Sequence, residues 1–391
     1  MTTAVLDNLE KIKDRIGELA EDAETLGKLP DESVQLVKGT GLTRMLQPKR
    51  YGGLESTPGE YIEAVMAAAS LGCSATGWVG GVVGLHPWEV GVMDPRVQEE
   101  VWGQDEDAWI ASPYVALGRA TRVDGGYRFS GRWAFSSGSD HASWVHLGGL
   151  ILDENGDALP GDHHFLIPRG DFEIVPDSWN TVGLRGTGSN DIVVKDAFVP
   201  EYRVLEYSTV VDGTAAAAVG LADNPLYGMP WFSLFGNAVS ATVVGICEGS
   251  LAATLDYQRE RADAFGTKIT EDSFTLPSIA EAASEIRASR LQILDNVNRI
   301  YDVLSKGGVP SKQMRAASRR DQVRASWRAV EAVDSLFCRT GGNAIRADKP
   351  MQRLWRDAHA GLNHAVNLPG PTYQLAARAL MGIEPPEGAL I

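Results

Sequence analysis

Apolar residues near the N-terminus recur every three or four positions, which is the spacing of a helix with one buried face. This stripe consists of Leu6, Leu9, Ile12, Ile16 and Leu19. Residues 31–38, 58–71 and 96–102 continue in the same style, with Gly- and Pro-containing breaks between them. The first hundred residues are therefore predicted to be helical.

The pattern changes between about residues 109 and 200, where short apolar runs alternate with turn residues. Residues 127–129, 144–147 and 192–194 are such runs, and they are typical of strands. Asp124-Gly125-Gly126 stands between two runs and predicts a tight hairpin. We expect a β domain of roughly 90 residues here.

Helical spacing returns after a Gly-, Ala- and Asn-rich connection that ends near Asn224. One long amphipathic helix is predicted over residues 279–304 and another over 323–337, and helices of this kind pack as an antiparallel bundle. The predicted fold class is α+β, with an N-terminal helical domain (1–107), a central β domain (108–205) and a C-terminal helical bundle domain (206–391). Because the long helices carry more apolar surface than one bundle buries, we also expect a homotetramer.

Charge and composition exclude several classes of partner. The 391 residues carry a net charge of −15 and a pI near 5.0, which argues against binding to a nucleic-acid backbone. The N-terminus has no apolar leader, and no uncharged apolar run reaches about 18 residues, so we expect a cytoplasmic protein without a membrane partner. Cys73, Cys247 and Cys338 are far apart, and we interpret all three as buried thiols in a reducing compartment.

Three segments resemble acyl-CoA dehydrogenases, and with the order of domains the resemblance covers essentially the whole chain. They are residues 183–191 (GLRGTGSND) running into 194–200 (VKDAFVP), residues 131–138 (GRWAFSSG), and residues 353–357 (RLWRD). The resemblance implies the acyl-CoA dehydrogenase fold and a flavin cofactor. Many dehydrogenases of this fold use a glutamate that follows the Arg-Asp motif, and this position is Ala365 here, preceded by His364. Because alanine cannot act as a base, dehydrogenase chemistry is disfavoured, although some relatives supply the base from another helix.

Four further segments resemble the two-component flavin-dependent monooxygenases built on the same fold. They are residues 356–364 (RDAHAGLNH), 136–141 (SSGSDH), 84–88 (GLHPW) and 320–325 (RDQVRA). The resemblance implies an oxygenase component that takes reduced FMN (or FAD) from a separate NAD(P)H-dependent flavin reductase and O2 as co-substrate. A small aromatic substrate, a phenol, would then be ortho-hydroxylated to a catechol through a C4a-hydroperoxyflavin. The secosteroid phenol of bacterial steroid catabolism is the first choice of substrate.

The alternatives remain an acyl-CoA dehydrogenase-type flavoenzyme, a hydroxylase of a smaller phenol or of a heteroatom, and a non-catalytic scaffold. The chain contains no dinucleotide-binding fingerprint, so we expect no NADH oxidation by the chain alone. His163-His164 is interpreted as a strand pair without further ligands at a useful spacing, and no metal site is predicted.

The resemblance implies catalytic roles for three residues. His364 is assigned to the flavin-hydroperoxide side and His86 to the phenol side, since imidazole titrates near neutrality. Ser112 is expected on a strand that faces the same cavity, where its hydroxyl contacts the phenol. For each residue the plainer interpretation is a structural group whose hydrogen bonds are satisfied.

Four residues are implied to bind the cofactor. Ser136 and Ser137 correspond to the hydroxyl position near flavin N5, and Trp133 lies in the segment that flanks the flavin ring. Arg261, ahead of Phe265-Gly266, corresponds to an arginine that reaches a flavin phosphate from the adjacent subunit. A strand-end turn for the serines and a surface salt bridge for Arg261 are the plainer alternatives.

Overall fold

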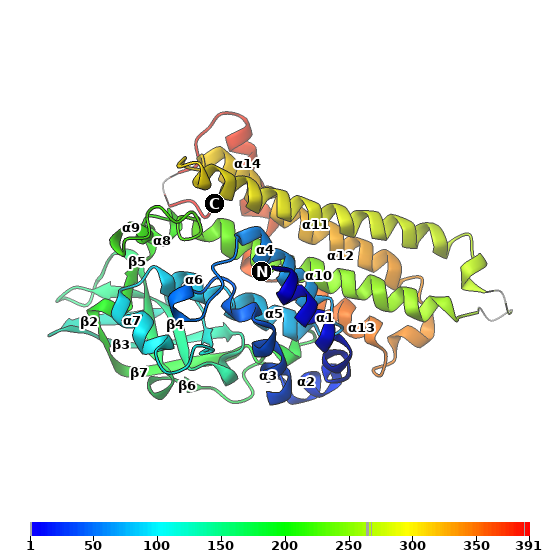
Figure 1. Cartoon of the computed structure of the whole chain (residues 1–391), viewed down its shortest axis with the longest axis horizontal. Helices are drawn as coiled ribbons and strands as arrows, with labels where there is room; N and C mark the ends of the chain where they lie inside the picture. The colour runs from blue at the N-terminus through cyan, green and yellow to red at the C-terminus, as the bar shows by residue number, and fades with distance from the viewer. Residues whose placement is uncertain (1, 263–265, 267, 387) are drawn as a thin grey trace.

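A computed structural model describes residues 2–262, 266, 268–386 and 388–391. The sheet lies at one end of the molecule, and the long C-terminal helices form the opposite end (Figure 1). The N-terminal helices pack between the two. Helices give way to strands between Trp102 and Ile110, and helices resume after Glu206. The predicted α+β class is confirmed, while the domain limits at residues 107 and 205 stay a prediction.

The N-terminal region is a series of helices, most of which the apolar spacing predicted. They are α1 (Thr2–Glu18), α2 (Ala20–Leu26), α3 (Asp31–Thr40), α4 (Pro58–Ala69), α5 (Ser74–Val83), α6 (His86–Gly91) and α7 (Pro95–Trp102). Helix α4 begins at a capping box in which Thr57 and Glu60 each bond the other's backbone N–H, with Pro58 in the first turn. These two bonds satisfy N–H groups that a helix start otherwise leaves unpaired.

The central region is one sheet. Its strands are β1 (Ile110–Ala111), β2 (Gly118–Val123), β3 (Gly126–Ser136), β4 (Trp144–Leu152), β5 (Ala158–Pro168), β6 (Glu173–Ile174), β7 (Asn190–Pro200) and β8 (Val204–Glu206). They run in the order β6-β7-β3-β2-β4-β5-β8, with β1 paired to β4. Val123 pairs with Gly126 across Asp124-Gly125, which confirms the predicted hairpin.

Strand β3 has an irregular register at the end that approaches the helices. Its pairing with β7 shifts between Trp133 and Ser136, which is the mark of a β-bulge. Phe135, inside the bulge, has a φ of 70°, a backbone conformation that is strained for an aromatic residue. The bulge breaks the regular alternation, so that Phe135 points outward and Ser136 inward.

The C-terminal region is a helical bundle with short connections. Its elements are α8 (Tyr207–Val211), α9 (Ala215–Ala218), α10 (Trp231–Arg259), α11 (Thr275–Ser305), α12 (Lys312–Phe337), α13 (Pro350–Leu362), the 3₁₀ turn η9 (Ala365–Asn367) and α14 (Pro369–Leu380). Helices α11 and α12 contain the two long helices predicted at 279–304 and 323–337. Helix α10 is long and apolar enough to cross a membrane by length and composition, but 72% of that apolar window is buried inside the protein, as expected of a core helix.

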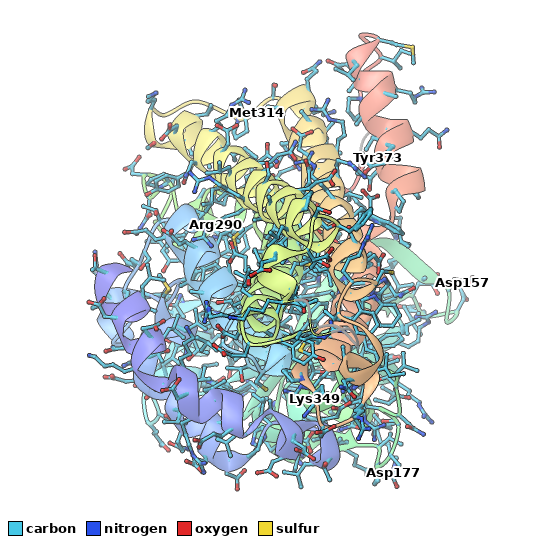
Figure 2. The ribbon with its side chains drawn as sticks, turned by 90° about the vertical axis from the view of Figure 1, so that its right-hand side faces the viewer. Asp157, Asp177, Arg290, Met314, Lys349 and Tyr373 are labelled. Atoms are coloured by element: carbon cyan, nitrogen blue, oxygen red, sulfur yellow. The ribbon has the colours of Figure 1, made fainter. Side chains whose placement is uncertain are left out.

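Charged side chains tie the three regions together. Arg290 of α11, labelled in Figure 2, bridges Glu248 of α10 (3.1 Å) and Glu63 of α4 (2.9 Å). In α13, Arg356 binds Glu24 of α2 at 2.5 Å, and the Asp357 carboxylate accepts the Leu184 N–H at 2.6 Å. Both neighbouring side chains of α13 therefore reach across to other segments of the chain.

Two observations concern the surface of the chain. Cys73 and Cys247 are buried, but Cys338 is exposed, so the prediction of three buried thiols is wrong for Cys338. Cys338 follows the last residue of α12, where the helix ends and its side chain faces out. Helix α14, which carries Tyr373 in Figure 2, packs against α12 at the edge of the bundle, and Leu380 and Met381 at its end are exposed.

Candidate active site

A row of aromatic and imidazole rings crosses the junction of the sheet, the N-terminal helices and the bundle. We call it the ring row, and its members are His86, Tyr114, Phe235, His364 and Trp78. Successive ring centroids are 5.5, 5.8, 5.9 and 5.8 Å apart. The two histidines predicted to be catalytic therefore belong to one chain of ring contacts, which runs from His86 through Tyr114 and Phe235 to His364.

His364 is held by the backbone. It caps η9, and its Nδ1 accepts the Val366 N–H at 3.3 Å. Since Nδ1 acts as an acceptor, the neutral ring carries its proton on Nε2. Burial, followed by the nearby Arg319 cation, lowers the pKa of His364 to about 4. At neutral pH the half-buried His364 is therefore a neutral N–H donor.

A polar network fixes the turn that carries His364. The Asn367 amide donates to Gly361 O (2.9 Å) and its carbonyl accepts from Ser240 of α10 (2.7 Å). Gln322 donates to the Val366 carbonyl at 3.3 Å. Sequence reasoning noted the segment 320–325 but did not assign Gln322 this supporting position.

Ser137 lies at the other end of the row, where the Trp78 indole N–H donates to its hydroxyl at 3.1 Å. Ser137 and Ser189 hydroxyls are 2.7 Å apart, those of Ser189 and Thr187 are 2.6 Å apart, and Thr187 donates to the Leu184 carbonyl at 2.8 Å. A carbonyl can only accept, so Thr187, Ser189 and Ser137 must each donate toward Leu184. The Ser137 hydroxyl has thus used its hydrogen and can only accept from a further group.

Ser136 is fully buried, and its hydroxyl has no hydrogen-bond partner within the described residues. The two predicted serines are adjacent in the chain, but their hydrogen bonding differs. The Ser137 hydroxyl is bonded on both sides, whereas the Ser136 hydroxyl, at the bulge, is not. A buried hydroxyl without a partner is costly unless a ligand or water satisfies it.

His86 is fully buried and is held by a side chain instead of the backbone. It starts α6, and its Nδ1 lies 2.6 Å from the Tyr114 hydroxyl. Its Nε2 has no partner in the part of the chain that the structure describes. Burial and then His146 lower the pKa of His86 to about 3, so its imidazole is neutral near pH 7. An unpaired buried nitrogen is a position that a ligand hydroxyl would satisfy.

Behind His86 lies a buried ionisable group of residues that sequence reasoning missed. We call it the Glu89 cluster, and it consists of Glu89, Tyr114, His146 and His164. The available signals were weak: Glu89 follows His86 by three residues in one helix, and the two histidines project from neighbouring strands β4 and β5. The pair His163-His164 was interpreted as a strand pair, which β5 confirms.

Ser112 is buried directly after β1, two residues before Tyr114. The prediction that it lies on a strand is wrong, because β1 ends at Ala111. None of the described hydrogen bonds involves the Ser112 side chain. The structure brings Ser112 to the loop that carries Tyr114, and the described residues show no hydrogen bond between Ser112 and His86.

Trp133 makes none of the ring contacts that define the ring row, and its place beside the cofactor stays a prediction. Its ring is fully buried in the sheet, 5.3 Å from Phe129, and its indole N–H donates to the carbonyls of Val115 (3.1 Å) and Gly148 (2.9 Å). Phe135, which we did not predict, is instead the aromatic residue that the bulge turns outward, with 70% of its surface exposed.

Arg261 lies far from the ring row of its own chain. It follows α10, and its guanidinium donates to the Thr340 carbonyl at 2.6 Å. Nineteen residues of α10 separate Ser240, beside the His364 turn, from Arg259, and at 1.5 Å per residue this is about 29 Å. Arg261 therefore cannot serve the site of its own chain. Phe265, named with it, lies outside the described residues.

Other features of the described chain lie apart from these residues. A hollow of about 80 Å³ opens between α11 and α12 beside Met314, labelled in Figure 2, and none of the predicted site residues lines it. Among the described residues no group of three or more histidine, cysteine, aspartate or glutamate side chains is arranged to hold a metal ion.

Known proteins resemble the chain over its full length. Residues 237–369 match the family model of the acyl-CoA dehydrogenase C-terminal domain. A pigment production hydroxylase from Rhodococcus erythropolis is 46% identical, with 98% of each chain covered. The flavin-dependent monooxygenase oxygenase subunit HsaA from Mycobacterium tuberculosis is 44% identical, over 98% of this chain and 95% of that protein. The crystal structure of that HsaA monooxygenase superposes with a TM-score of 0.93 at 40% identity, covering 100% of both chains.

The fold and the ring row thus define a flavoenzyme of the acyl-CoA dehydrogenase fold. Within that class, the chain belongs to the oxygenase components of the two-component flavin-dependent monooxygenases. It is a monooxygenase that uses reduced flavin supplied by a separate reductase.

Proposed function

We propose that the chain ortho-hydroxylates a bulky phenol to a catechol, with the secosteroid phenol of bacterial steroid catabolism as its substrate. The ring row carries this proposal, because its ring contacts connect two neutral imidazoles through Tyr114 and Phe235. The Nε2 of His364 is a donor, and that of His86 is buried without a partner. Hydroxylation of a phenol needs one group on the side of the oxidant and another at the phenolic oxygen.

The residues present fit a reduced flavin. The Ser137 hydroxyl has a free acceptor site and no hydrogen to give, which suits the N–H that a reduced flavin ring carries at N5. The unpaired Ser136 hydroxyl and the outward Phe135 ring stand beside it. When bound, reduced flavin with O2 supplies the electrophilic oxygen atom. We assign Ser136, Ser137 and Phe135 to the binding of the ring.

His364 is proposed to act as a hydrogen-bond donor. Its Nε2–H is fixed by the Val366 N–H, so it can steady a negatively polarised oxygen without giving up its proton. His86 is proposed to accept the proton of the phenol, since a phenol attacks best as phenolate. Ser112 is proposed to bind the phenolic oxygen from the Tyr114 loop, supported by its buried position next to that loop.

A homotetramer in the cytoplasm is proposed as the working form. Support comes from Arg261, which lies about 29 Å along α10 from its own site and is suited to a flavin phosphate of another subunit. The exposed apolar residues Leu380 and Met381 of α14 also favour burial between subunits. Light scattering at micromolar concentration tests this, and a monomeric mass would remove the role of Arg261.

A smaller phenol is the second candidate substrate. Trp231 and Phe235 stack with centroids 4.3 Å apart, and both are buried in the described chain. A large fused-ring substrate requires these side chains to move, whereas a single-ring phenol needs less space. Thioester dehydrogenation is not proposed, since Ala365 occupies the position of the usual base.

The test is product formation with a flavin reductase, NADH and a panel of phenols from one ring to fused rings. We expect catechol from the fused-ring phenol with the lowest peroxide yield per flavin oxidised. We also expect no NADH consumption when the reductase is omitted, because the chain has no dinucleotide fingerprint. Rapid NADH oxidation by this chain and flavin alone would contradict a two-component enzyme. Tight coupling only with single-ring phenols would favour the second candidate.

A further inference from the structure

Arg319 of α12 is a buried cation that contacts the turn bearing His364. Arg319 is 5% exposed, and burial lowers the pKa of its guanidinium only to about 10, so the group stays charged near neutral pH. Taking such a charge out of water is costly unless its donors are engaged. The partners of Arg319 therefore indicate what it does in this position.

The guanidinium of Arg319 bonds directly to the His364 turn. Its Nη1 donates to the Val366 carbonyl at 3.0 Å and also to the side-chain oxygen of Gln322. Gln322 donates to the same Val366 carbonyl at 3.3 Å. This carbonyl oxygen therefore accepts two hydrogen bonds, which uses both of its lone pairs.

Three further contacts hold the guanidinium of Arg319 in its plane. Nε donates to the Leu390 carbonyl at 3.3 Å, and Nη2 donates to the Thr372 hydroxyl at 3.4 Å. The central carbon lies 5.2 Å from the centroid of the Phe232 ring, where a cation is attracted to the ring face. These contacts come from three other segments, so they fix the guanidinium independently of the turn.

An arginine has only donors, and this sets the direction of the hydrogen bonds beyond it. The Gln322 side-chain oxygen must face Arg319, so the Gln322 nitrogen is left to face the turn. That nitrogen donates to the Asn367 side-chain oxygen at 3.2 Å. The Asn367 nitrogen then donates to the Gly361 carbonyl at 2.9 Å. The bonds thus run in one direction from Arg319 to the end of α13.

Val366 is the residue at which these bonds reach the histidine. Its carbonyl is held by Arg319, and its N–H donates to His364 Nδ1 at 3.3 Å. The second bond leaves the proton of the neutral imidazole on Nε2. A rotation of the turn at Val366 would therefore disturb the tautomer of His364.

Helix α10 makes room for this arrangement with a glycine. A Cβ atom at Gly236 would lie 3.0 Å from the Gln322 side-chain oxygen and 3.2 Å from Arg319 Nη1, both closer than an ordinary van der Waals contact. Glycine in a helix interior is less stable than alanine. The helix therefore gives up local stability at the point where it passes Arg319 and Gln322.

We propose that Arg319 is a positioning residue that keeps the His364 Nε2–H in place as a donor to the oxidant. It does so by setting the direction of the bonds through Gln322 and Asn367 and by holding the Val366 carbonyl. The inference rests on the proposed function, in which His364 steadies a polarised oxygen. Arg319 acts through the turn and not on the reacting atoms.

The positive charge of Arg319 has a second effect on the same histidine. Burial first, and then this cation, lower the pKa of His364 to about 4. The rings that contact His364, Trp78 of α5 and Phe235 of α10, carry no charge. Loss of the cation should therefore let His364 bind a second proton at a higher pH.

Arg315 is the matched control, because it is a buried arginine one turn earlier on α12. It donates to the carbonyls of Ile391 (2.9 Å) and Val211 (3.1 Å). None of the described hydrogen bonds joins it to residues 364–367. Arg315→Gln therefore removes a buried cation from the same helix without touching the His364 turn.

The first experiment follows His364 without any turnover. Solid-state ¹⁵N spectra of histidine-labelled protein, with His364 assigned by comparison with His364→Gln, show which nitrogen carries the proton. In the parent and in Arg315→Gln we expect the proton on Nε2. In Arg319→Gln we expect both tautomers near neutral pH, and a second proton at a higher pH than in the parent. An unchanged tautomer in Arg319→Gln would overturn the proposal.

The second experiment measures the hydroxylated product formed per flavin oxidised. For Arg319→Gln we expect about a ten-fold loss, the effect of one lost hydrogen bond from a charged group, with peroxide making up the difference. Arg319→Lys keeps the charge and a donor and should recover part of the loss. Arg315→Gln should couple nearly as the parent does. Equal losses in all three variants would mean that α12 has loosened as a whole and would contradict the proposal.

Gly236→Ala displaces the same pair without removing any polar group, and it keeps the test decisive if Arg319→Gln does not fold. Helix propensity alone predicts that alanine makes the protein more stable. We expect lower coupling in this variant, because the new methyl group must push Gln322 or Arg319 aside. Coupling equal to that of the parent would contradict a fixed pair.

These experiments separate the inference from the proposed function. If the parent forms no hydroxylated phenol under any condition, the proposed function fails while the tautomer of His364 can still be read. If the parent hydroxylates phenols and both Arg319 variants keep its coupling and its tautomer, only the present inference fails.

Discussion

The two histidines of the ring row are held in different ways. His364 is half-buried, and a backbone N–H fixes its Nδ1 as an acceptor. His86 is fully buried, and a tyrosine hydroxyl meets its Nδ1. A backbone amide can only donate, whereas a hydroxyl can donate or accept. The tautomer of His364 is therefore set by the fold alone, while the hydroxyl of Tyr114 permits either tautomer of His86.

This difference shows that two neutral imidazoles in one site need not do the same chemistry. Both histidines have a lowered pKa, so neither is charged near pH 7. A fixed N–H donor suits a residue that steadies an oxygen, whereas a buried nitrogen without a partner among the described residues, as His86 Nε2 is, suits a residue that receives a proton. Three changes to the protein would break or sharpen this comparison.

Replacing His364 with alanine should have the largest effect. Reduced flavin should still bind, because the Ser137 hydroxyl and the serine chain behind it are untouched. Loss of one fixed donor to a polarised oxygen commonly costs about 10²–10³ in the chemical step. We expect the hydroxylated product per flavin oxidised to fall sharply and hydrogen peroxide to make up the difference, which quantification of both products measures.

His359→Gln is the matched control for this variant. His359 lies one turn away on α13, where it bonds the Trp355 carbonyl and is 3.2 Å from Asp334. It should couple oxygen to product as the parent does. If His364→Ala also couples like the parent, His364 is structural and its catalytic assignment moves to His86.

The pH dependence of the free energy of unfolding should reveal the buried histidines around His86. Burial lowers the pKa of His146 from 6.5 to about 4 and that of His86 to about 3. Below pH 6.5 these histidines are protonated in the unfolded chain but remain neutral in the folded protein. The free energy of unfolding is therefore highest above pH 6.5 and falls as the pH drops toward 4. Each such histidine contributes a slope of up to about 1.4 kcal/mol per pH unit.

His146→Leu removes one of these titratable imidazoles. It breaks no hydrogen bond, because neither His146 nitrogen has a hydrogen-bond partner among the described residues. Urea unfolding between pH 4 and 7 should show a shallower slope for the variant than for the parent. An equal slope in both would mean that His146 is already protonated in the folded protein. Unfolding midpoints at each pH give the measurement directly.

Trp78→Phe should have the smallest effect of the three. The variant keeps an aromatic ring next to His364 but removes the indole N–H that binds Ser137. Ser137 keeps its bond to Ser189, so we expect about a five- to ten-fold loss of coupling, the effect of one hydrogen bond. An unchanged peroxide yield would show that the two ends of the row work independently.

Much of the fold could be predicted from local sequence patterns, each of which spans only a few residues. Helices α11 and α12, the β2–β3 hairpin and the α+β class were predicted because apolar periodicity and Asp-Gly turns are local signals. His364 and His86 were found through motifs that resemble a known family. The structure then showed that both belong to one row of rings. Their separation along the chain gave no sign of this proximity.

What the sequence could not predict depends on contacts across the fold. Trp133 was assigned to the cofactor because its segment resembles the one that flanks the flavin ring, whereas the bulge that turns Phe135 outward leaves no signal in the sequence. Glu89 was missed because its partners, His146 and His164, are over fifty residues away in the sequence and are brought to it only by the fold. Cys338 is exposed because α12 ends just before it.

The length of α10 has a genetic consequence. Since about 29 Å separates the level of His364 from the end that bears Arg261, the proposed tetramer builds each catalytic centre from two chains. Two alleles, one encoding His364→Ala and the other Arg261→Ala, would each yield a defective enzyme when expressed alone. Expressed together, they would assemble some centres in which both side chains are intact. Partial recovery of hydroxylation in such a heterozygous strain would be interallelic complementation.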